Sequence, residues 1–243
     1  MKQIRPKLSL IIPVFNEEKR LAKGIKTLES VTRRMPRRFE LIVVDDGSLR
    51  PQQAFLPKTS LPIDFFRLFQ NRGKGAAIAE GVKRARGEYI VFCDIDFSVP
   101  PEAIIRIVEA LSSHDIAIAS RRLPGSVIAT HQPIVRELSG RIFTFLSNVV
   151  CDARVADVTC GCKGFRASVA KRLFSARRID RWVFDTEILF LARKWGYRIA
   201  EVPVVWRDRI GTKVKPWDLI GSFIDLFKIR WYSWKGEYVR FLR

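Results

Sequence analysis

The stretch GKGAAIAEGVKRARGEYIVFCDID (Gly73–Asp96) decides the fold class. Two glycines open a segment with helical spacing that ends at Gly87, and the apolar run that follows is typical of a buried strand, here ending in two aspartates. A helix followed at once by such a strand is half of a strand–helix–strand unit, the unit from which parallel sheets are built.

The rest of the first half of the chain repeats this alternation. Short apolar runs typical of strands cover Leu8–Val14, Phe39–Ser48, Ile63–Asn71 and Asp115–Arg121, and helical spacing covers 17–34 and 101–112. The pattern predicts an α/β fold, with a mainly parallel sheet covered by helices on both faces.

The second half is less regular. Helical spacing predicts helices over 135–150, 169–174 and 185–195, and IAEVPVVW (199–206) predicts one further strand. We expect Gly161 and Gly164 to lie in backbone turns. There is no internal repeat or low-complexity linker in the sequence, so we expect one domain over 1–212 followed by an aromatic, basic tail over 213–243.

The composition is strongly basic. Against 25 Asp and Glu the 243-residue chain carries 44 Lys and Arg, a formal net charge of +19, which predicts attraction to nucleic acid, anionic lipid or a phosphorylated substrate. The four cysteines lack zinc-like spacing, so we expect free thiols in a reducing cytosol. We expect neither a signal peptide nor a membrane-spanning segment, because the apolar runs are too short.

Polar clusters follow three of the expected strands, at Asn16-Glu17, Asp45-Asp46 and Asp94–Asp96. Ligands of such sheets bind beyond the carboxyl ends of the strands. Two carboxylates at i and i+2 suit Mg²⁺ or Mn²⁺ bound to a diphosphate, or else they cap the next helix. Likewise, Asn16-Glu17 could bind a base and ribose or cap a helix, and Asp45-Asp46 could bind a nucleoside or form a turn.

Seven motifs in order then support a resemblance to a known family. SLIIPVFNEE, LIVVDDGS, NRGKGAAIAEGVKRARGEYIVFCDID and ASRRLPGS together resemble the inverting glycosyltransferases of family 2, which have the Rossmann-like GT-A fold. DVTCGCKGF, WVFDTEILFLARKWGYRIAEVPVVW and RIGTKVKP are similar to its polyprenyl-phosphate branch, which includes dolichyl-phosphate mannose synthases and β-glucosyltransferases. The resemblance covers about residues 8 to 230.

The resemblance implies a nucleotide-sugar donor and a lipid-phosphate acceptor. By motif, the nucleotide sugar would be bound by Pro13, Phe15, Glu17, Val44, Asp46, Lys74, Asp94, Ile95, Asp96, Arg121, Arg209 and Lys215. The acceptor phosphate would be bound by Arg136, Ser139 and Lys213. The catalytic residues would be Asp94, Asp96, Arg121 and Asp185, and Asp157 and Glu187 would position the sugar or a loop.

The resemblance also implies a divalent cation, Mg²⁺ or Mn²⁺, held by Asp94 and Asp96. In mannose synthases a glutamine two residues after the second aspartate can complete the metal shell; here that position is Ser98, which we expect to be a weaker ligand. An acceptor phosphate oxygen is already a nucleophile, so the site needs positioning and charge neutralisation more than a strong base. In-line attack would invert the anomeric carbon. The motifs favour UDP-glucose, with GDP-mannose as the alternative.

The tail predicts a helix at a surface. Its apolar residues are Leu219, Ile220, Phe223, Leu226, Phe227, Ile229 and Trp231, with aromatic and basic neighbours. This pattern suits an interfacial helix on the anionic, cytoplasmic face of a membrane, or a helix packed on the catalytic domain or on a partner subunit. Two other functions are a family 2 transferase to a soluble carbohydrate and a nucleic-acid-binding module, which the acids at three strand ends disfavour.

Overall fold

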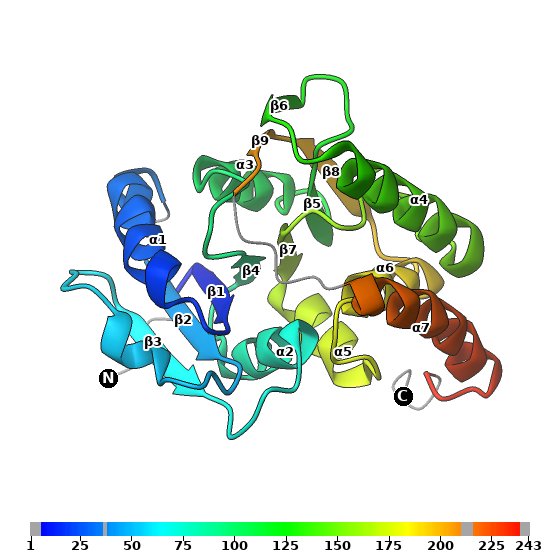
Figure 1. Ribbon diagram of the computed structural model, residues 1–243, viewed down its shortest axis with the longest axis horizontal. Coiled ribbons are helices and arrows are strands. Elements are labelled where there is room, and N and C mark those ends of the chain that lie inside the picture. Colours follow the sequence, from blue (N-terminus) through cyan, green and yellow to red (C-terminus); the bar gives the residue numbers. More distant parts are fainter. Residues whose placement is uncertain (1–5, 36–37, 210–215, 239–243) are drawn as a thin grey trace.

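The structure is a computed structural model that describes residues 6–35, 38–209 and 216–238. A seven-stranded sheet has the strand order β3-β2-β1-β4-β7-β5-β8 (Figure 1). Its strands are β1 (Leu8–Val14), β2 (Phe39–Asp45), β3 (Ile63–Arg67), β4 (Tyr89–Cys93), β5 (Ile116–Ser120), β7 (Cys162–Arg166) and β8 (Ile199–Pro203). Neighbouring strands are parallel except around β7, which runs antiparallel to both β4 and β5.

Helices cover both faces of this sheet, as expected. They are α1 (Glu18–Val31), α2 (Lys74–Arg84), α3 (Glu102–Ala110), α4 (Ile134–Cys151), α5 (Ala167–Ala176), α6 (Phe184–Lys194) and α7 (Pro216–Trp234), with short 3₁₀ turns at Thr32–Arg34 and Gln52–Phe55. The apolar faces of α1 and α3 enter one core layer, and those of α2, α5 and α6 enter the other. The α/β fold with a mixed, mainly parallel sheet is confirmed.

Strand β7 was not expected, and the prediction that Gly164 serves a turn is wrong. Gly164 lies inside β7, opposite Val91 and Ala117 of the neighbouring strands. A Cβ at this position would lie 2.4 Å from Cγ2 of Ile107 on α3, so the absent side chain lets the helix pack against the sheet. The sequence CKGFR does not predict a strand, because it contains a glycine and a lysine, and the lysine is buried in the structure.

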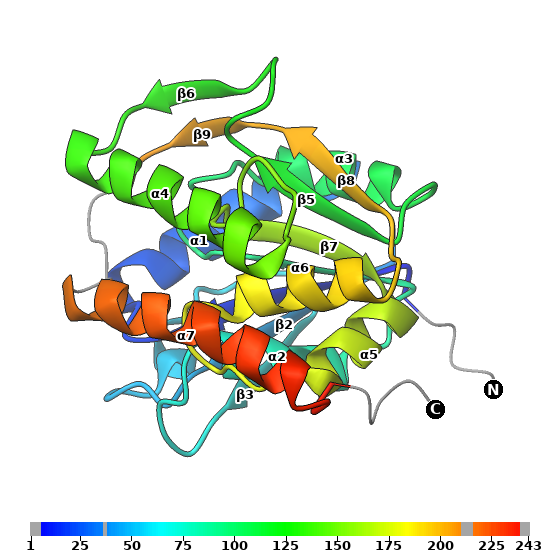
Figure 2. The same cartoon turned by 90° about the vertical axis from the view of Figure 1, so that its right-hand side faces the viewer.

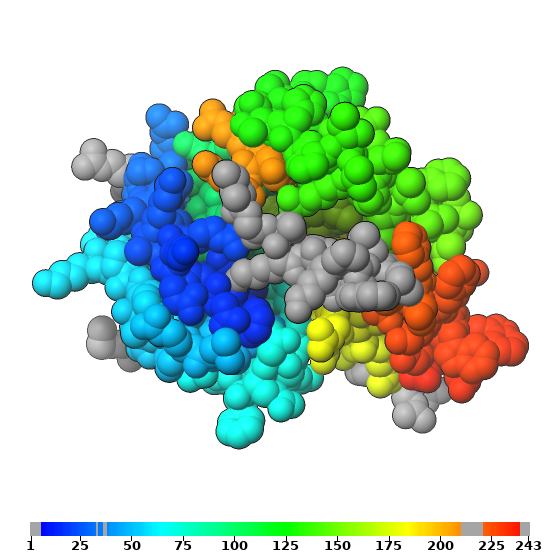
Figure 3. Space-filling view, in the orientation of Figure 1, coloured from blue at the N-terminus to red at the C-terminus, as the bar shows by residue number. Residues whose placement is uncertain are grey.

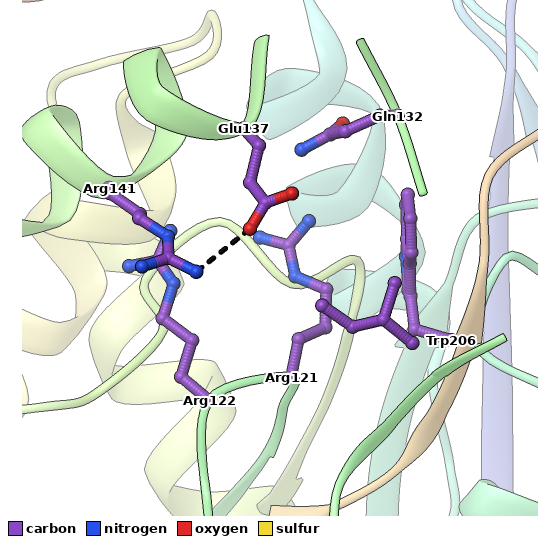
Figure 4. A pocket seen from close by; sticks show the side chains of 7 residues that line it. Arg121, Arg122, Gln132, Glu137, Arg141 and Trp206 are labelled. Atoms are coloured by element: carbon purple, nitrogen blue, oxygen red, sulfur yellow. Dashed lines mark hydrogen bonds and ion pairs between the residues drawn. The ribbon is translucent and has the colours of Figure 1, made fainter. Parts of the chain in front are cut away.

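The expected single strand over 199–206 is divided in two. β8 ends at Pro203, and the N–H of Val204 donates to Oγ of Ser126 rather than to the main sheet. The chain continues as β9 (Val205–Arg207), which pairs in parallel with β6 (Val127–Thr130). This small second sheet lies over the carboxyl end of β5 and carries Trp206 toward it (Figures 2 and 4).

Helix α7 packs on the catalytic domain, which is one of the expectations for the tail. Its Leu226 and Ile229 are buried, and the ring of Phe223 lies 6.4 Å from that of Phe143 on α4. Its opposite side is exposed to solvent. The side chains of Leu219 and Ile220 lie outside the described part of the chain. Within the residues that are described, none of the helices has the length and hydropathy required to cross a bilayer.

Candidate active site

The three polar clusters come together at one edge of the sheet. β2, β1 and β4 are adjacent parallel strands, so their carboxyl ends meet. Two hydrogen bonds tie the first two ends: the N–H of Asn16 donates to Oγ of Ser48 at 2.8 Å, and the N–H of Leu49 donates to Oδ1 of Asn16 at 2.9 Å. The amide of Asn16 therefore joins two loops, and the expectation that it caps α1 is wrong.

Asp94 and Asp96 follow β4 directly and do not cap the next helix. α3 begins at Glu102, its N-cap position is Pro101, and no side chain caps it. Oδ1 of Asp94 instead lies 2.6 Å from Nζ of Lys74, at the start of α2. Oδ1 of Asp96 accepts the N–H of Ser98 at 2.9 Å, and its Oδ2 lies 3.8 Å from Arg20. Both carboxylates are thus held at the strand end by groups of opposite charge or by backbone.

Two glycines, Gly161 and Gly24, leave space for the loop that carries Asp94 and Asp96. A Cβ on Gly161 would lie 2.1 Å from Oδ2 of Asp94, and a Cβ on Gly24 would lie 2.4 Å from the carbonyl oxygen of Ile95. The Ile95 side chain is itself buried. Sequence reasoning missed both contacts, because each joins segments far apart in the chain. Gly161 does not merely turn the backbone; it keeps the space beside Asp94 open.

The two carboxylates fit a divalent cation. Oxygen atoms are the ligands that Mg²⁺ and Mn²⁺ prefer, and the space that a Cβ on Gly161 would fill lies against Oδ2 of Asp94. Among the described residues no group of three or more His, Cys, Asp or Glu side chains converges. These residues therefore offer the carboxylates of Asp94 and Asp96 and leave other positions to a ligand or water.

Lys74 and Asp94 belong to a longer chain of charges. Asp185, in the first turn of α6, is buried, and its Oδ1 lies 2.9 Å from Nζ of the buried Lys163. Burial raises the pKa of Asp185, while the charges of Lys163 and Lys74 oppose that rise. Burial alone would lower the pKa of Lys74, but the negative charges of Asp94 and Asp185 outweigh this effect and raise it. Lys163 had no functional signal in the sequence.

Asp46 holds the loop that leads into α2. Its carboxylate accepts the N–H groups of Arg72 and Gly73, both at 2.9 Å, and Nδ2 of Asn71 at 2.8 Å. Burial raises the pKa of Asp46, although these backbone hydrogen bonds act in the opposite direction. In this structure the carboxylate fixes Gly73, the residue before Lys74, and so positions the lysine that meets Asp94.

The other residues expected around a nucleoside line the same edge. Pro13 and Val44 are register partners on β1 and β2, and Val44 is wholly buried. Glu17 pairs with Arg20 at 2.6 Å, and its N–H donates to Oε1 of Gln52. Phe15 is half-buried beside them.

Arg121 lies at the carboxyl end of β5 and is firmly held. Its Nε and Nη2 donate to the two oxygens of Asp157 at 2.6 and 2.8 Å, its Nη2 also donates to Oγ1 of Thr159, and its guanidinium lies 5.3 Å from the Trp206 ring. Burial disfavours the Asp157 carboxylate, but Arg121 outweighs burial and lowers the pKa of Asp157. The same pairing raises the pKa of Arg121 despite its burial.

A pocket of about 250 Å³ opens beside Arg121 (Figure 4). Its lining residues are Arg121, Arg122, Ile128, Gln132, Glu137, Arg141 and Trp206, and we call it the arginine pocket. Three guanidinium groups face one carboxylate, Glu137, whose Oε1 accepts Nη2 of Arg141 at 2.8 Å. The excess of positive charge suits an anion. Sequence reasoning missed Arg122 and Arg141, although the pair of arginines in ASRR was a signal for the first.

The remaining expected residues either do not line this pocket or lie outside the described residues. Arg136 lies 3.4 Å from Asp208, the Ser139 hydroxyl donates to the carbonyl of Val135 within α4, and Arg209 is exposed. Lys213 and Lys215 fall outside the described residues. Glu187 is buried and accepts the N–H groups of Arg178 and Ile179 and the Tyr238 hydroxyl, so it holds the loop before α6.

Comparison with known proteins assigns this arrangement to a family. The profile described as Glycosyl transferase family 2 matches residues 9–174. The chain is 31% identical to the dolichyl-phosphate beta-glucosyltransferase of Dictyostelium discoideum, over 92% of this chain and 73% of that protein. It is also 31% identical to the human dolichyl-phosphate beta-glucosyltransferase, over 96% of this chain and 79% of that protein.

A solved structure shares the fold. Glucosyl-3-phosphoglycerate synthase from Mycobacterium tuberculosis, in complex with Mn²⁺, uridine-diphosphate and phosphoglyceric acid, aligns with a TM-score of 0.67. The alignment covers 94% of this chain and 78% of that one, at 18% sequence identity. At this identity the likeness concerns the fold, and it agrees with the sheet order and helix layers described above.

Proposed function

The chain belongs to glycosyl transferase family 2, and from this premise we propose that it transfers glucose from UDP-glucose to a polyprenyl phosphate such as dolichyl phosphate. The name of the relatives, dolichyl-phosphate beta-glucosyltransferase, supports glucose as the transferred sugar and dolichyl phosphate as the acceptor. The product is a β-linked lipid phosphate sugar. The enzyme works at the cytoplasmic face of an anionic membrane, to which residues 213–243 contribute an interfacial segment.

One observation carries the proposal: the acidic loop after β4 and the arginine pocket beside the end of β5 lie at the same edge of the sheet. β4 and β5 both run antiparallel to β7 and so parallel to each other, and β7 alone separates them in the sheet order. Two strand spacings put the ends of β4 and β5 about 10 Å apart. Asp94 follows one strand and Arg121 the other, so a donor diphosphate at the first and an acceptor phosphate at the second meet over β7.

On the donor side, Asp94 and Asp96 are the residues that would hold Mg²⁺ or Mn²⁺. When bound, the cation neutralises the diphosphate and stabilises it as a leaving group. Ser98 is the remaining oxygen donor of this loop. Lys74 lies against Asp94 and brings a further positive charge to the same place. The edges of β1 and β2 bind the nucleoside through Pro13, Phe15, Glu17, Val44 and Asp46.

On the acceptor side, the arginine pocket binds the lipid phosphate. Arg121, Arg122 and Arg141 neutralise its charge, and Arg136, Ser139 and Lys213 complete the approach. A phosphate oxygen attacks the anomeric carbon as the bond from that carbon to the nucleoside diphosphate breaks, so the configuration inverts. A strong general base is not needed, since the nucleophile is already an anion. Asp185, which is paired with Lys163, stabilises the positive charge of Lys74, and Arg209 and Lys215 add positive charge that favours the phosphates.

A donor and acceptor panel tests the proposal. UDP-glucose, GDP-mannose and other UDP-sugars are each incubated with polyprenyl phosphate in detergent, with Mn²⁺, Mg²⁺ or EDTA. We expect a glucosyl lipid from UDP-glucose, lost with EDTA and reduced at least a hundredfold by Asp94→Asn. The control Asp64→Asn removes an exposed carboxylate from the edge strand β3 and should have no effect. Transfer from GDP-mannose alone, or only to soluble carbohydrates, would refute the assignment.

A further inference from the structure

Two buried cysteines face each other across the strand pair β4 and β7. Cys93 ends β4, Cys162 begins β7, and the two are register partners in this antiparallel pair. Their Sγ atoms lie 2.6 Å apart, although 69 positions separate the two residues along the chain. Both residues are almost wholly buried, at 2% and 1% exposure. The fold therefore brings two sulfur atoms into direct contact, and spacing along the chain does not show it.

The backbone around this contact suits a disulfide. Cα atoms of directly opposed residues on antiparallel strands lie about 4.5 to 5.5 Å apart, which is within the range of about 4.4 to 6.8 Å that disulfides span. An S–S bond is about 2.05 Å long, so the two sulfur atoms need to approach by only about half an ångström. A bond between Cys93 and Cys162 therefore requires no rearrangement of the sheet.

The other two cysteines do not share this geometry. Cys160 is buried in the same core layer as Cys93 and Cys162, but it precedes β7 and is not a register partner of Cys93. Cys151 ends α4 in the opposite core layer, where its Sγ lies 3.6 Å from the carbonyl oxygen of Leu226. The register of the sheet thus selects one pair among the four cysteines.

The pair adjoins the acidic loop. Cys93 directly precedes Asp94, and Cys162 directly follows Gly161, the residue at which a Cβ would lie 2.1 Å from Oδ2 of Asp94. Figure 1 draws β4 and β7 side by side between α1 and α4, and the space-filling view in Figure 3 shows the atoms of these two helices on either side of the same face. A covalent bond between the two cysteines would fasten the loop after β4 to the start of β7.

We propose that Cys93 and Cys162 form a redox modification site, which a peroxide oxidises to a disulfide that fastens the loop of Asp94 and Asp96 to β7. Hydrogen peroxide converts one thiol to a sulfenic acid and releases one water molecule. The second thiol then attacks the sulfenic sulfur, so that the S–S bond forms and the hydroxyl group leaves as a second water. The peroxide takes up the two electrons. A small oxidant suits this pair because both sulfur atoms are buried. The inference is independent of the proposed function, since neither sugar nor lipid takes part.

Mass mapping tests the pair. The full chain is purified with a phosphine reductant, one portion is oxidised with equimolar hydrogen peroxide, and the remaining thiols are alkylated with N-ethylmaleimide in denaturant. After oxidation only, trypsin should release peptides 87–106 and 155–163 linked to each other, and fragmentation should place the bond at Cys162. Because 155–163 also contains Cys160, two matched variants are compared. Cys160→Ala should retain the linked peptides, and Cys162→Ala should lose them.

Thermal unfolding and hydrogen exchange test what the bond does. It joins positions 69 apart, so the oxidised parent should melt about 10 °C above the reduced parent, and Cys162→Ala should show no such difference. Amide exchange over 94–98, where the N–H of Phe97 donates to the carbonyl of Asp94, should be slower after oxidation.

Three outcomes would overturn the modification site: absence of the linked peptides, a bond at Cys160, or equal melting temperatures of the oxidised and reduced parent. Unchanged exchange over 94–98 in the oxidised protein would overturn the fastening of the acidic loop. Fragmentation of the linked peptides locates the bond in the parent itself, so the mapping holds even where a variant does not fold.

Discussion

Replacing Gly161 by alanine should disable the acidic site without unfolding the protein. The added methyl group would lie 2.1 Å from Oδ2 and 2.9 Å from Cγ of Asp94, whereas ordinary contact begins at 3.4 Å. The Asp94 carboxylate must therefore move by about 1 Å. A displacement of that size at a reacting centre can lower the rate about a hundredfold, or about 2.7 kcal/mol of transition-state stabilisation.

The assay is the steady-state rate of glucosyl transfer at several Mn²⁺ concentrations. We expect kcat/KM to fall about a hundredfold and the Mn²⁺ concentration for half-maximal rate to rise, because the displaced carboxylate is the expected metal ligand. Gly221→Ala is the matched control. Gly221 lies on α7 with no atom within 4 Å of an added Cβ, so alanine there should raise helix stability by about 1 kcal/mol and leave the rate unchanged.

Two measurements decide between loss of the site and loss of the fold. Circular dichroism and the melting temperature should show Gly161→Ala folded at the assay temperature. A variant that is folded, transfers at the parental rate and has an unchanged Mn²⁺ dependence would refute the assignment of Asp94 to the catalytic centre.

Tyr238→Phe should lower the free energy of unfolding by about 2 kcal/mol in urea titrations, since the buried hydroxyl donates to Glu187 at 2.6 Å; an unchanged midpoint would contradict this. Asp157→Asn should cost about 3 kcal/mol at neutral pH by breaking a buried ion pair. The folded-state pKa of Asp157 is lowered, so the parent should lose this contribution as the pH falls below about 4. The unfolding free energies of the parent and the variant should therefore converge at low pH. A difference between them that does not change with pH would contradict the ion pair. Lys74→Gln should tighten Mn²⁺ binding several-fold in calorimetry without nucleotide, because no ammonium group then competes with the cation for Asp94. The same variant should lower the transfer rate about tenfold. Weaker Mn²⁺ binding by this variant would show that the lysine and the cation do not share the carboxylate.

Local sequence patterns predicted most of the strands and helices of the protein. The alternation of apolar runs and helical spacing is short-range, so β1 to β5 and α1 to α6 follow from it within a few residues. The acids at the ends of β1, β2 and β4 were predicted to meet because parallel neighbours share an edge, and they do. β6 and β7 were not predicted, because β6 is short and exposed and β7 contains a glycine and a buried lysine.

What the amino-acid sequence alone determined is therefore the fold class, the acidic edge and the family of the chain. The contacts that complete the site were decided by tertiary structure. Arg121 meets Asp157 across 36 positions, Gly161 lies against Asp94, and Lys163 pairs with Asp185 only because β7 enters the sheet antiparallel beside β4. Charges and glycines have no periodicity of their own. Their partners are set by how the sheet is ordered, and spacing along the chain does not record that order.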